Sequence, residues 1–293
     1  MNAPVKKIIL IPNPRKEISP EKICSIISRL HHAGCDIGYY AEDGSSLPEF
    51  THAVDDAGFS EADAALVLGG DGSIIEAVHK TMKYGIPVVG INFGHVGYLT
   101  EIEDGESDLL EKLAEGEYEI DRRMMLTAEI TDCDGKTMAD FTVLNDLVLT
   151  NGPVARLIKF DILSDENKIE TCRADGLIVA TPTGSTAYSL SAGGPVIDSR
   201  LECICLTPIC PHTIGSRPIV ISGNETVLVK NISSNGSSVY LNADGREVIK
   251  IENDYTVKIR KSKMYASLIR LKPLGFLGIL EKKLSSSNHN AFE

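Results

Sequence analysis

The chain lacks any apolar run long enough to cross a bilayer. Its apolar runs, such as the one that ends at Ile8–Ile11, are much shorter than the roughly 20 residues of a membrane helix. The apolar stretch of a signal peptide is also missing, since Lys6 and Lys7 directly precede a strand-like segment. We therefore expect a protein with no membrane partner and no secretory leader.

The seven cysteines include no C-x-x-C pair, and their number is odd. A disulfide framework is unusual in a chain of this length, so this usage favours a reducing, cytoplasmic location. Cys203, Cys205 and Cys210 cluster, as zinc ligands do, but the first two alternate within an apolar run. We therefore favour buried thiols on a strand and expect no metal site there. The full set is Cys24, Cys35, Cys133, Cys172, Cys203, Cys205 and Cys210.

Basic residues are too few to balance the acidic ones, since 29 Lys and Arg against 41 Asp and Glu give a net charge of −12. An acidic surface argues against a nucleic-acid partner, because binding a phosphate backbone needs local positive charge. A small anionic ligand remains compatible, since a few arginines and backbone N–H groups can hold one. The 293 residues, 43% of them hydrophobic and 24% charged, indicate a folded protein with two domains or one large domain.

The first part of the sequence alternates strand-like and helix-like segments. Continuous apolar strands in such an alternation predict a parallel sheet with helices on both faces. The charge-rich segment Glu101–Glu119 is predicted to be a helix with a solvated face. The other expected elements are strands at Lys7–Ile11, Asp36–Tyr40, Ala64–Leu68 and Ile86–Ile91, and helices at Ser19–Ala33 and Ile74–Tyr84.

From about Glu117 onward, β-rich segments alternate with turns of Asp, Gly, Asn and Ser. Turns such as Asp134-Gly135 and Asn235-Gly236 are typical of β-hairpins. The sequence thus predicts an α/β N-terminal domain with a parallel sheet, plus a mainly antiparallel β C-terminal domain. Arg122-Arg123 opens a β segment, and we expect it to pair with nearby acids such as Asp121 at the surface.

Gly69-Gly70-Asp71-Gly72-Ser73 lies between a predicted strand and a predicted helix. The glycines allow a tight turn, and the helix start offers N–H groups that suit phosphate. A carboxylate about 4 Å from a phosphate charge costs about 4 kcal/mol at an effective dielectric of about 20, so a loop that only holds phosphate would avoid Asp71. The acid instead suggests a proton acceptor for a hydroxyl or a partner of a phosphate-bound magnesium ion. A structural Gly-Asp turn that caps the helix is the alternative.

Two further segments suggest a binding site. Within Asp175–Pro195, a predicted strand at Leu177–Ala180 leads into a run of hydroxyls that can line a polar ligand. Tyr188 offers a flat face for a base or nicotinamide ring, although an ordinary loop is the alternative. Asn145-Asp146 interrupts an apolar strand, where the pair needs partners and could hold the hydroxyls of a ribose; a bulge or strand end is the alternative. The loop Asn92–Thr100 follows a buried strand, so Phe93 or Tyr98 is expected to border the pocket.

In their order and spacing, Gly69–Gly72, Asn145-Asp146 and Asp175–Pro195 resemble the motifs of the NAD kinase family. The resemblance covers nearly the whole chain, from Val5 to about Leu284. The first motif is weak alone, because phosphofructokinases and diacylglycerol-type lipid kinases share it, whereas the Asp175–Pro195 run is highly specific.

The resemblance implies transfer of a phosphoryl group from ATP or polyphosphate to the 2′-hydroxyl of the adenosine ribose of NAD, with Mg²⁺ or another divalent metal accompanying ATP. Asp71 would be the catalytic base. One position departs from the family pattern, because Arg246 stands where Gln is frequent; the acid of the Asn-acid pair is the shorter Asp146, a recognised variant. The substrate-binding positions implied are Asp71, Gly72, Asn145, Asp146, Arg156, Arg173, Asp175, Thr186, Ala187, Tyr188, Ser189, Leu190, Ser191 and Arg246.

The resemblance also implies a homodimer or homotetramer and a C-terminal segment that returns to the first domain. The expected domains are residues 1–118 with 268–293, which carry the Gly-Gly-Asp-Gly loop, and residues 119–267, a β-rich NAD-binding domain. Two alternatives remain. A kinase of a lipid or sugar hydroxyl would have an apolar or sugar-sized cleft, and a non-catalytic NAD(P)-binding sensor would lack productive ATP binding.

Overall fold

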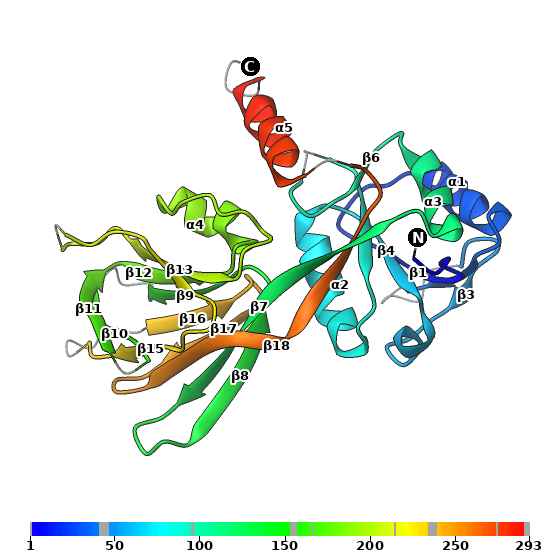
Figure 1. The fold of residues 1–293 in the computed structure, drawn as a ribbon. Helices are drawn as coiled ribbons and strands as arrows, with labels where there is room; N and C mark the ends of the chain where they lie inside the picture. Colours follow the sequence, from blue (N-terminus) through cyan, green and yellow to red (C-terminus); the bar gives the residue numbers. More distant parts are fainter. Residues whose placement is uncertain are drawn as a thin grey trace. The chain divides into compact units, whose positions relative to one another are not determined.

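The computed structural model describes residues 2–40, 47–94, 97–152, 157–165, 167–213, 215–233, 239–273 and 275–289. The chain divides into two compact units, which Figure 1 shows as a ribbon. The first unit consists of Met1–Arg122 and Ala266–Glu293, and the second of Arg123–Tyr265. No helix within the described ranges is long and apolar enough to span a bilayer.

The first unit is built on a parallel sheet, which confirms the predicted fold class. The strand order is β18-β5-β4-β1-β2-β3, with β6 beside β5, and all of these pairs are parallel. The strands are β1 (Lys7–Pro12), β2 (Asp36–Tyr39), β3 (His52–Ala53), β4 (Ala64–Leu68), β5 (Val88–Asn92), β6 (Ile102–Glu103) and the end of β18 (Thr256–Arg270).

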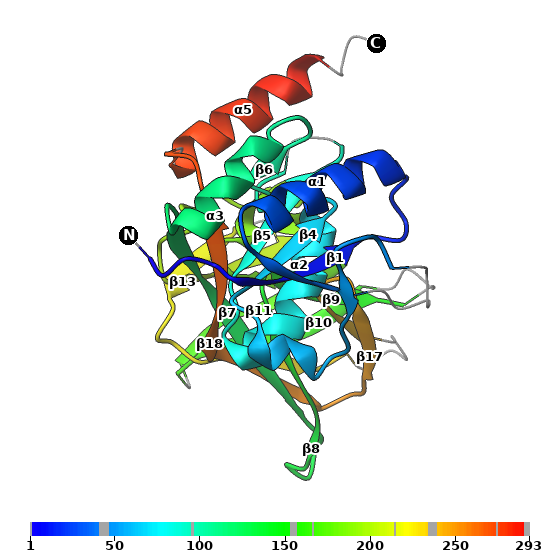
Figure 2. The ribbon, with the colours of Figure 1, turned by 90° about the vertical axis from the view of Figure 1, so that its right-hand side faces the viewer.

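Helices cover both faces of this sheet because its strands are apolar on both sides. α1 (Pro20–His32) and α3 (Glu111–Glu115) pack side by side on one face, where Leu30 and Leu113 share a core with Leu66 (Figure 2). α2 (Asp71–Thr81) packs on β4 and β5, and a Cβ atom at Gly90 would lie 2.4 Å from Ile74 Cδ1. α2 begins one turn earlier than predicted, which places Asp71 in its first turn.

The segment Glu101–Glu119 is not the predicted solvated helix. It forms β6, a 3₁₀-helix at Ser107–Leu110, the short α3 and the start of β7 (Glu119–Thr131). Gly105 and Gly116 adopt left-handed backbone with φ of 100° and 74°, which interrupts any longer helix. Glu101 is buried at 8% exposure, so its charge belongs to the interior and not to a solvated face.

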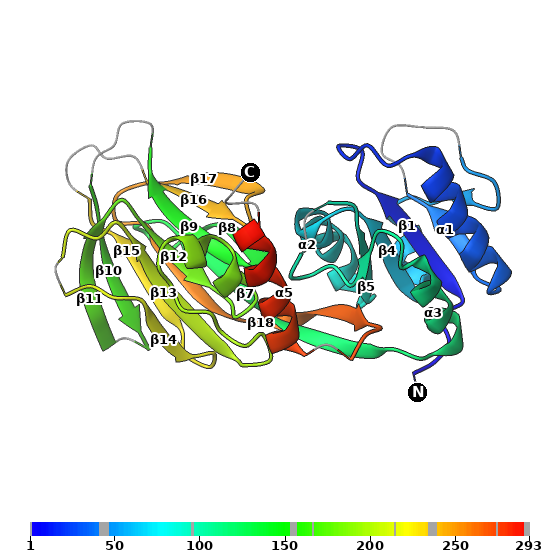
Figure 3. The same cartoon turned by 90° about the horizontal axis from the view of Figure 1, so that it is seen from above.

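The second unit is antiparallel, also as predicted. One sheet has the order β14-β13-β12-β9-β16-β17. The other contains β11, β10, β15 and β18, with β7 paired to β18 and β8. Figure 3 shows the strands of both sheets. Both sheets contribute to one apolar core, and α4 (Tyr188–Ser191) packs on β12. The strands are β8 (Thr137–Val143), β9 (Asp146–Asn151), β10 (Ile158–Ser164), β11 (Asn167–Ala174), β12 (Gly176–Ala180), β13 (Cys203–Ile209), β14 (Ile219–Ser222), β15 (Val227–Asn231), β16 (Val239–Ala243) and β17 (Glu247–Ile251).

Local expectations in the second unit meet mixed outcomes. Asp134-Gly135 turns between β7 and β8 with a Gly135 φ of 81°, whereas Asn235-Gly236 lies outside the described residues. Cys203 and Cys205 are buried on β13, which confirms them as strand thiols. Arg123 is not a surface residue: it is 5% exposed, and its Nη1 donates to Thr183 Oγ1 at 3.3 Å.

Candidate active site

The Gly-Gly-Asp-Gly loop connects the end of β4 to the start of α2. A Cβ atom at Gly69 would lie 2.3 Å from Ser73 Oγ, so only glycine allows this turn. Ser73 Oγ accepts a hydrogen bond from Asn13 Nδ2 at 2.7 Å, which fixes the loop to the end of β1. Gly70 is the N-cap of α2 and Asp71 lies in its first turn, where backbone N–H groups without helical partners favour an anion.

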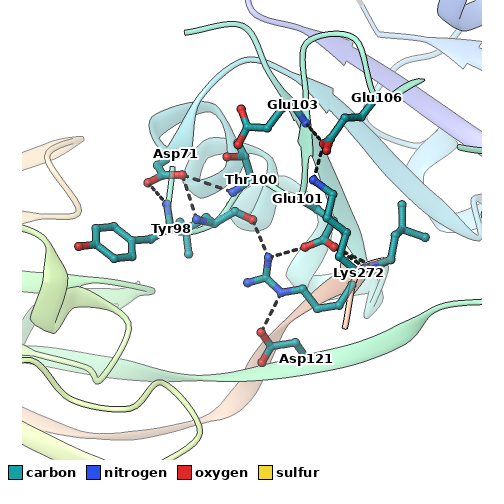
Figure 4. A network of polar contacts seen from close by, with 11 residues as sticks. Asp71, Tyr98, Thr100, Glu101, Glu103, Glu106, Asp121 and Lys272 are labelled. Atoms are coloured by element: carbon teal, nitrogen blue, oxygen red, sulfur yellow. Dashed lines mark hydrogen bonds and ion pairs between the residues drawn. The ribbon is translucent and has the colours of Figure 1, made fainter. Parts of the chain in front are cut away.

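The carboxylate of Asp71 is held by three successive backbone N–H groups, which we call the 98–100 amides (Figure 4). Tyr98 N donates to Oδ2 at 2.8 Å. Leu99 N and Thr100 N donate to Oδ1 at 3.0 and 3.3 Å. An ionised carboxylate offers about four lone-pair directions, so these bonds leave one direction, on Oδ2. Asp71 therefore has a fixed orientation and an acceptor site to spare.

Gly97 allows this arrangement. A Cβ atom at Gly97 would lie 2.2 Å from Asp71 Oδ1 and 2.5 Å from Thr100 Oγ1, and that hydroxyl is buried without a hydrogen-bond partner. Two side-chain oxygens therefore occupy the space that a Cβ atom at residue 97 would need. The loop was predicted to border a pocket, but its bonds to Asp71 were not predicted.

We expect Gly97→Ala to lower kcat about tenfold or more, because the added methyl group must displace the Asp71 carboxylate from the 98–100 amides. The measurement is steady-state turnover, with folding checked by thermal unfolding. Gly275→Ala is the matched control, since a Cβ atom there meets nothing within 4 Å. Equal turnover in the two variants would contradict the expectation.

In the second unit, the turn Leu144-Asn145-Asp146 is held by the carboxylate of Asp244. Leu144 N donates to Oδ2 at 2.7 Å, and Asn145 N and Asp146 N donate to Oδ1 at 2.8 and 3.1 Å. We call these donors the 144–146 amides. Asp244 lies in the turn after β16 with a φ of 50°, a conformation that Asp and Asn tolerate better than most residues. Each unit thus has an aspartate that binds three successive backbone N–H groups.

Asn145 has the features of a ligand-binding residue. Its Oδ1 is buried and has no hydrogen-bond partner in the protein. Its carbonyl oxygen accepts from Thr181 N at 2.9 Å, and a Cβ atom at Gly184 would lie 2.1 Å from the same oxygen. An unsatisfied buried acceptor costs free energy that a ligand donor can recover.

Asp146 is a buried carboxyl group, 6% exposed. Burial, and secondarily the charge of Asp244, raises the pKa of Asp146 to about 7. A carboxyl group that holds its proton near neutral pH can donate a hydrogen bond as well as accept one.

We expect Asp146→Asn to remove a pH dependence of stability. An unfolded aspartate loses its proton near pH 4, whereas folded Asp146 holds it to about pH 7. Between these values the folded state binds more protons, so the free energy of unfolding falls as pH rises. In urea titrations from pH 5 to pH 8, wild type should lose about 1–4 kcal/mol relative to the variant. Parallel curves for the two proteins would contradict this.

Much of the hydroxyl-rich run is structural, which corrects the interpretation that it lines a ligand. Thr181, Thr183, Ser185 and Ser189 are all buried. Thr181 Oγ1 donates to Leu144 O at 2.6 Å, and Ser185 Oγ donates to Pro182 O at 2.6 Å. Ser189 Oγ is 2.9 Å from Thr207 Oγ1, so its side chain faces the interior. These hydroxyls satisfy the polar groups of a buried turn after β12 and fix the turn that carries Asn145.

The remaining predicted positions differ in exposure. Thr186, Ala187 and Asp175 are half-buried, and Leu190 is 37% and Tyr188 46% exposed. Arg156 lies outside the described residues. The residues left exposed are Gly72, Arg173, Ser191 and Arg246.

Sequence reasoning missed Asp244 and the 98–100 amides. The Asp244-Gly245-Arg246 segment drew attention only through Arg246, yet the carboxylate of Asp244 makes the contacts. Asp244 lies far along the chain from the 144–146 amides, so the sequence gives no sign that they are hydrogen-bonded. Among the described residues, no group of three or more His, Cys, Asp or Glu is placed to hold a metal ion.

Two sequence-family models match the chain. The ATP-NAD kinase N-terminal domain matches residues 16–118, and the ATP-NAD kinase C-terminal domain matches residues 144–271. An NAD kinase of Symbiobacterium thermophilum is 38% identical over 284 residues, 96% of this chain and 99% of the relative. An NAD kinase of Caldanaerobacter subterraneus is 37% identical over 292 residues, with the same coverage of 96% and 99%.

Two solved structures share the fold. A yeast NADH kinase complexed with NADH superposes with a TM-score of 0.85 at 22% identity, covering 97% of this chain and 88% of that chain. An NAD kinase from Archaeoglobus fulgidus in complex with ATP gives a TM-score of 0.76 at 26% identity, covering 95% and 99%. Together with the full-length relatives, these matches show that the chain belongs to the NAD kinase family, whose members are phosphotransferases with an alcohol group as acceptor.

Proposed function

We propose that this chain transfers the γ-phosphoryl group of ATP to the 2′-hydroxyl of the adenosine ribose of NAD, giving ADP and NADP. The observation that carries the proposal is the Asp71 carboxylate, fixed by the 98–100 amides with one acceptor direction left on Oδ2. Relatives named NAD kinase, one solved relative bound to NADH and another bound to ATP support the same substrates.

In the proposed mechanism, Asp71 acts as general base. The free direction of Oδ2 accepts the proton of the ribose hydroxyl as its oxygen attacks the γ-phosphorus, and ADP leaves on the opposite side. Because the 98–100 amides already orient the Asp71 carboxylate, reaching the transition state costs little further conformational entropy. The N–H groups at the start of α2 are suited to phosphate oxygens.

We propose that the second unit recognises NAD. The unpartnered Oδ1 of Asn145 accepts a ligand donor, and Asp146 contacts the same substrate. Asp175 accepts from the nicotinamide carboxamide. The positively charged Arg173 and Arg246 contribute to binding the anionic substrates, a part that Arg156 shares. Gly72 and the segment of Thr186, Ala187, Tyr188, Ser189, Leu190 and Ser191 complete the substrate contacts, with Ser189 contributing through its backbone because its side chain is buried.

The divalent ion, Mg²⁺ or another metal, is proposed to enter with ATP. Such an ion would neutralise charge on the phosphate oxygens and so stabilise the departing ADP. Polyphosphate offers the same anhydride chemistry and remains a proposed alternative donor. We further propose a cytoplasmic homodimer or homotetramer, which size-exclusion chromatography with light scattering would test.

The deciding experiment mixes purified protein with NAD, ATP and Mg²⁺ and measures NADP with a dehydrogenase specific for NADP. Formation of NADP that requires all three additions supports the proposal. Tight NAD binding without NADP would favour the sensor, and phosphorylation of a lipid or sugar instead would favour the other kinase class. Replacing ATP by polyphosphate, and NAD by NADH, defines the donor and acceptor.

A further inference from the structure

The loop that holds Asp71 is itself held from a second direction. The carbonyl oxygen of Leu99 accepts a hydrogen bond from Arg270 Nη1 at 3.3 Å. Its neighbours Tyr98 and Thr100, and Leu99 itself, donate their N–H groups to Asp71. One short stretch of backbone therefore binds Asp71 through its N–H groups and Arg270 through the Leu99 carbonyl oxygen. Figure 4 shows Asp71, Tyr98 and Thr100 in the same polar network as Glu101 and Asp121.

Arg270 is a buried residue between two carboxylates. Its Nη1 bonds Glu101 Oε2 at 3.1 Å, and its Nε bonds Asp121 Oδ2 at 3.1 Å. The side chains of Arg270 and Glu101 are 10% and 6% exposed, and that of Asp121 is 20% exposed. Burying charge is costly unless it is paired; Nη1 and Nε have these carboxylate partners, whereas Nη2 is buried without a hydrogen-bond partner. The planar guanidinium reaches three acceptors at once, which a lysine ammonium on a flexible stem does not do.

Glu101 also binds the backbone directly after Arg270, at the end of β18. Its Oε1 accepts from the backbone N–H groups of Leu271 and Lys272, both at 2.8 Å. The N–H of Glu101 donates to Gly90 O at 3.1 Å, within β5 of the parallel sheet. Glu101 follows Thr100 directly in sequence. The 98–100 amides are therefore fixed both through the Leu99 carbonyl and through the residue that comes next.

We infer that Arg270 and Glu101 are positioning residues for phosphoryl transfer: they hold the Tyr98–Thr100 backbone so that its amides orient the Asp71 carboxylate. This inference rests on the proposed function, in which Asp71 is the base. It assigns neither residue a contact with substrate. When the network is loosened, the Asp71 carboxylate can rotate so that the free direction of Oδ2 no longer points at the ribose hydroxyl. Turnover then falls while substrate affinity stays the same.

The test compares Arg270→Lys and Arg270→Gln with wild type. Arg270→Lys keeps a positive charge beside Glu101 and Asp121, so it retains the fold but loses the fork that reaches Leu99 O. We expect kcat to fall about tenfold in Arg270→Lys and about 100-fold in Arg270→Gln, with KM for NAD and ATP within about threefold of wild type. Amide hydrogen exchange at Tyr98, Leu99 and Thr100 should be faster than wild type in Arg270→Lys and faster still in Arg270→Gln.

Two controls separate positioning from general stability. Leu30→Ala empties a fully buried core position of the same unit, so it lowers the unfolding temperature without touching the network. Arg29→Met removes an exposed ion pair with Glu111, whose side chains are 37% and 55% exposed. Both should keep wild-type kcat per folded molecule.

The inference is overturned if both Arg270 variants keep wild-type kcat, or if kcat falls only as far as in Leu30→Ala at matched loss of stability. A raised KM with unchanged kcat also overturns it. If the wild type forms no NADP, the proposed function has failed instead. The amide exchange then still reports whether Arg270 holds the loop.

Discussion

Replacing Asp71 with asparagine is expected to lower kcat by about 10²–10⁴-fold while NAD still binds. The asparagine oxygen can occupy the place of Oδ1 and accept from Leu99 N and Thr100 N, which lie 3.0 and 3.3 Å from it in the wild type. The amide nitrogen then stands where Oδ2 was. The direction that was free to accept a ribose proton now presents an N–H group. The variant therefore keeps two of the three bonds to the 98–100 amides, leaves the Tyr98 N–H without its acceptor, and loses its base.

Turnover and NAD affinity are measured separately, by coupled assay and by calorimetry. Glu76→Gln is the matched control, because Glu76 is an exposed acid on the same helix. Wild-type turnover in Asp71→Asn would show that this carboxylate only shapes the turn. Weakened NAD binding with an unchanged kcat at saturating NAD would assign the Asp71 carboxylate to substrate binding instead.

The architecture could be predicted because it depends on local patterns. The apolar run Ala64–Leu68 predicts a central strand, and that is β4. Gly85 predicts the end of a helix, and its φ is 70°. The prediction of a solvated helix at Glu101–Glu119 was wrong for a physical reason. A charged residue is expected at the surface unless a residue of opposite charge pairs with it in the interior. The partner of Glu101 is Arg270, which lies far along the chain and cannot be recognised from the local sequence.

The candidate site was predictable in its residue types and not in its contacts. Asp71 and Asn145 stand out in sequence because a carboxylate and an amide are unusual at their positions. Asp71 is oriented by backbone amides, which carry no sequence signature, and Asn145 is oriented by the carboxylate of Asp244, which lies far along the chain. The hydroxyls after β12 misled for a related reason, since Thr and Ser satisfy a buried turn as readily as they bind a ligand.

Asp244 gives the second large effect. Asp244→Ala leaves the 144–146 amides without their acceptor, and we expect the free energy of unfolding to fall by about 3–5 kcal/mol. The backbone adds to this cost, because alanine is strained at the φ of 50°. Asp244→Asn tolerates that φ and keeps an oxygen for two of the three donors, so about 1–3 kcal/mol should be lost. Urea titration measures both, with Asp134→Ala in an exposed hairpin turn as control.

The Asp244 variants also show whether Asp244 orients the turn Leu144-Asn145-Asp146 for NAD binding or only stabilises the fold. Asn145 and Asp146 receive their orientation from Asp244, so NAD affinity should fall about tenfold in Asp244→Asn, even at temperatures where the protein is fully folded. The charge of Asp244 also helps to raise the pKa of Asp146, so the pKa of Asp146, followed by carbon-detected NMR, should fall in Asp244→Asn. A variant that loses stability but keeps both wild-type NAD affinity and the wild-type pKa of Asp146 would make Asp244 a fold element only. A joint change in stability, NAD affinity and the pKa of Asp146 shows that the Asp244 carboxylate supports the turn and adds to the effect of burial on that pKa.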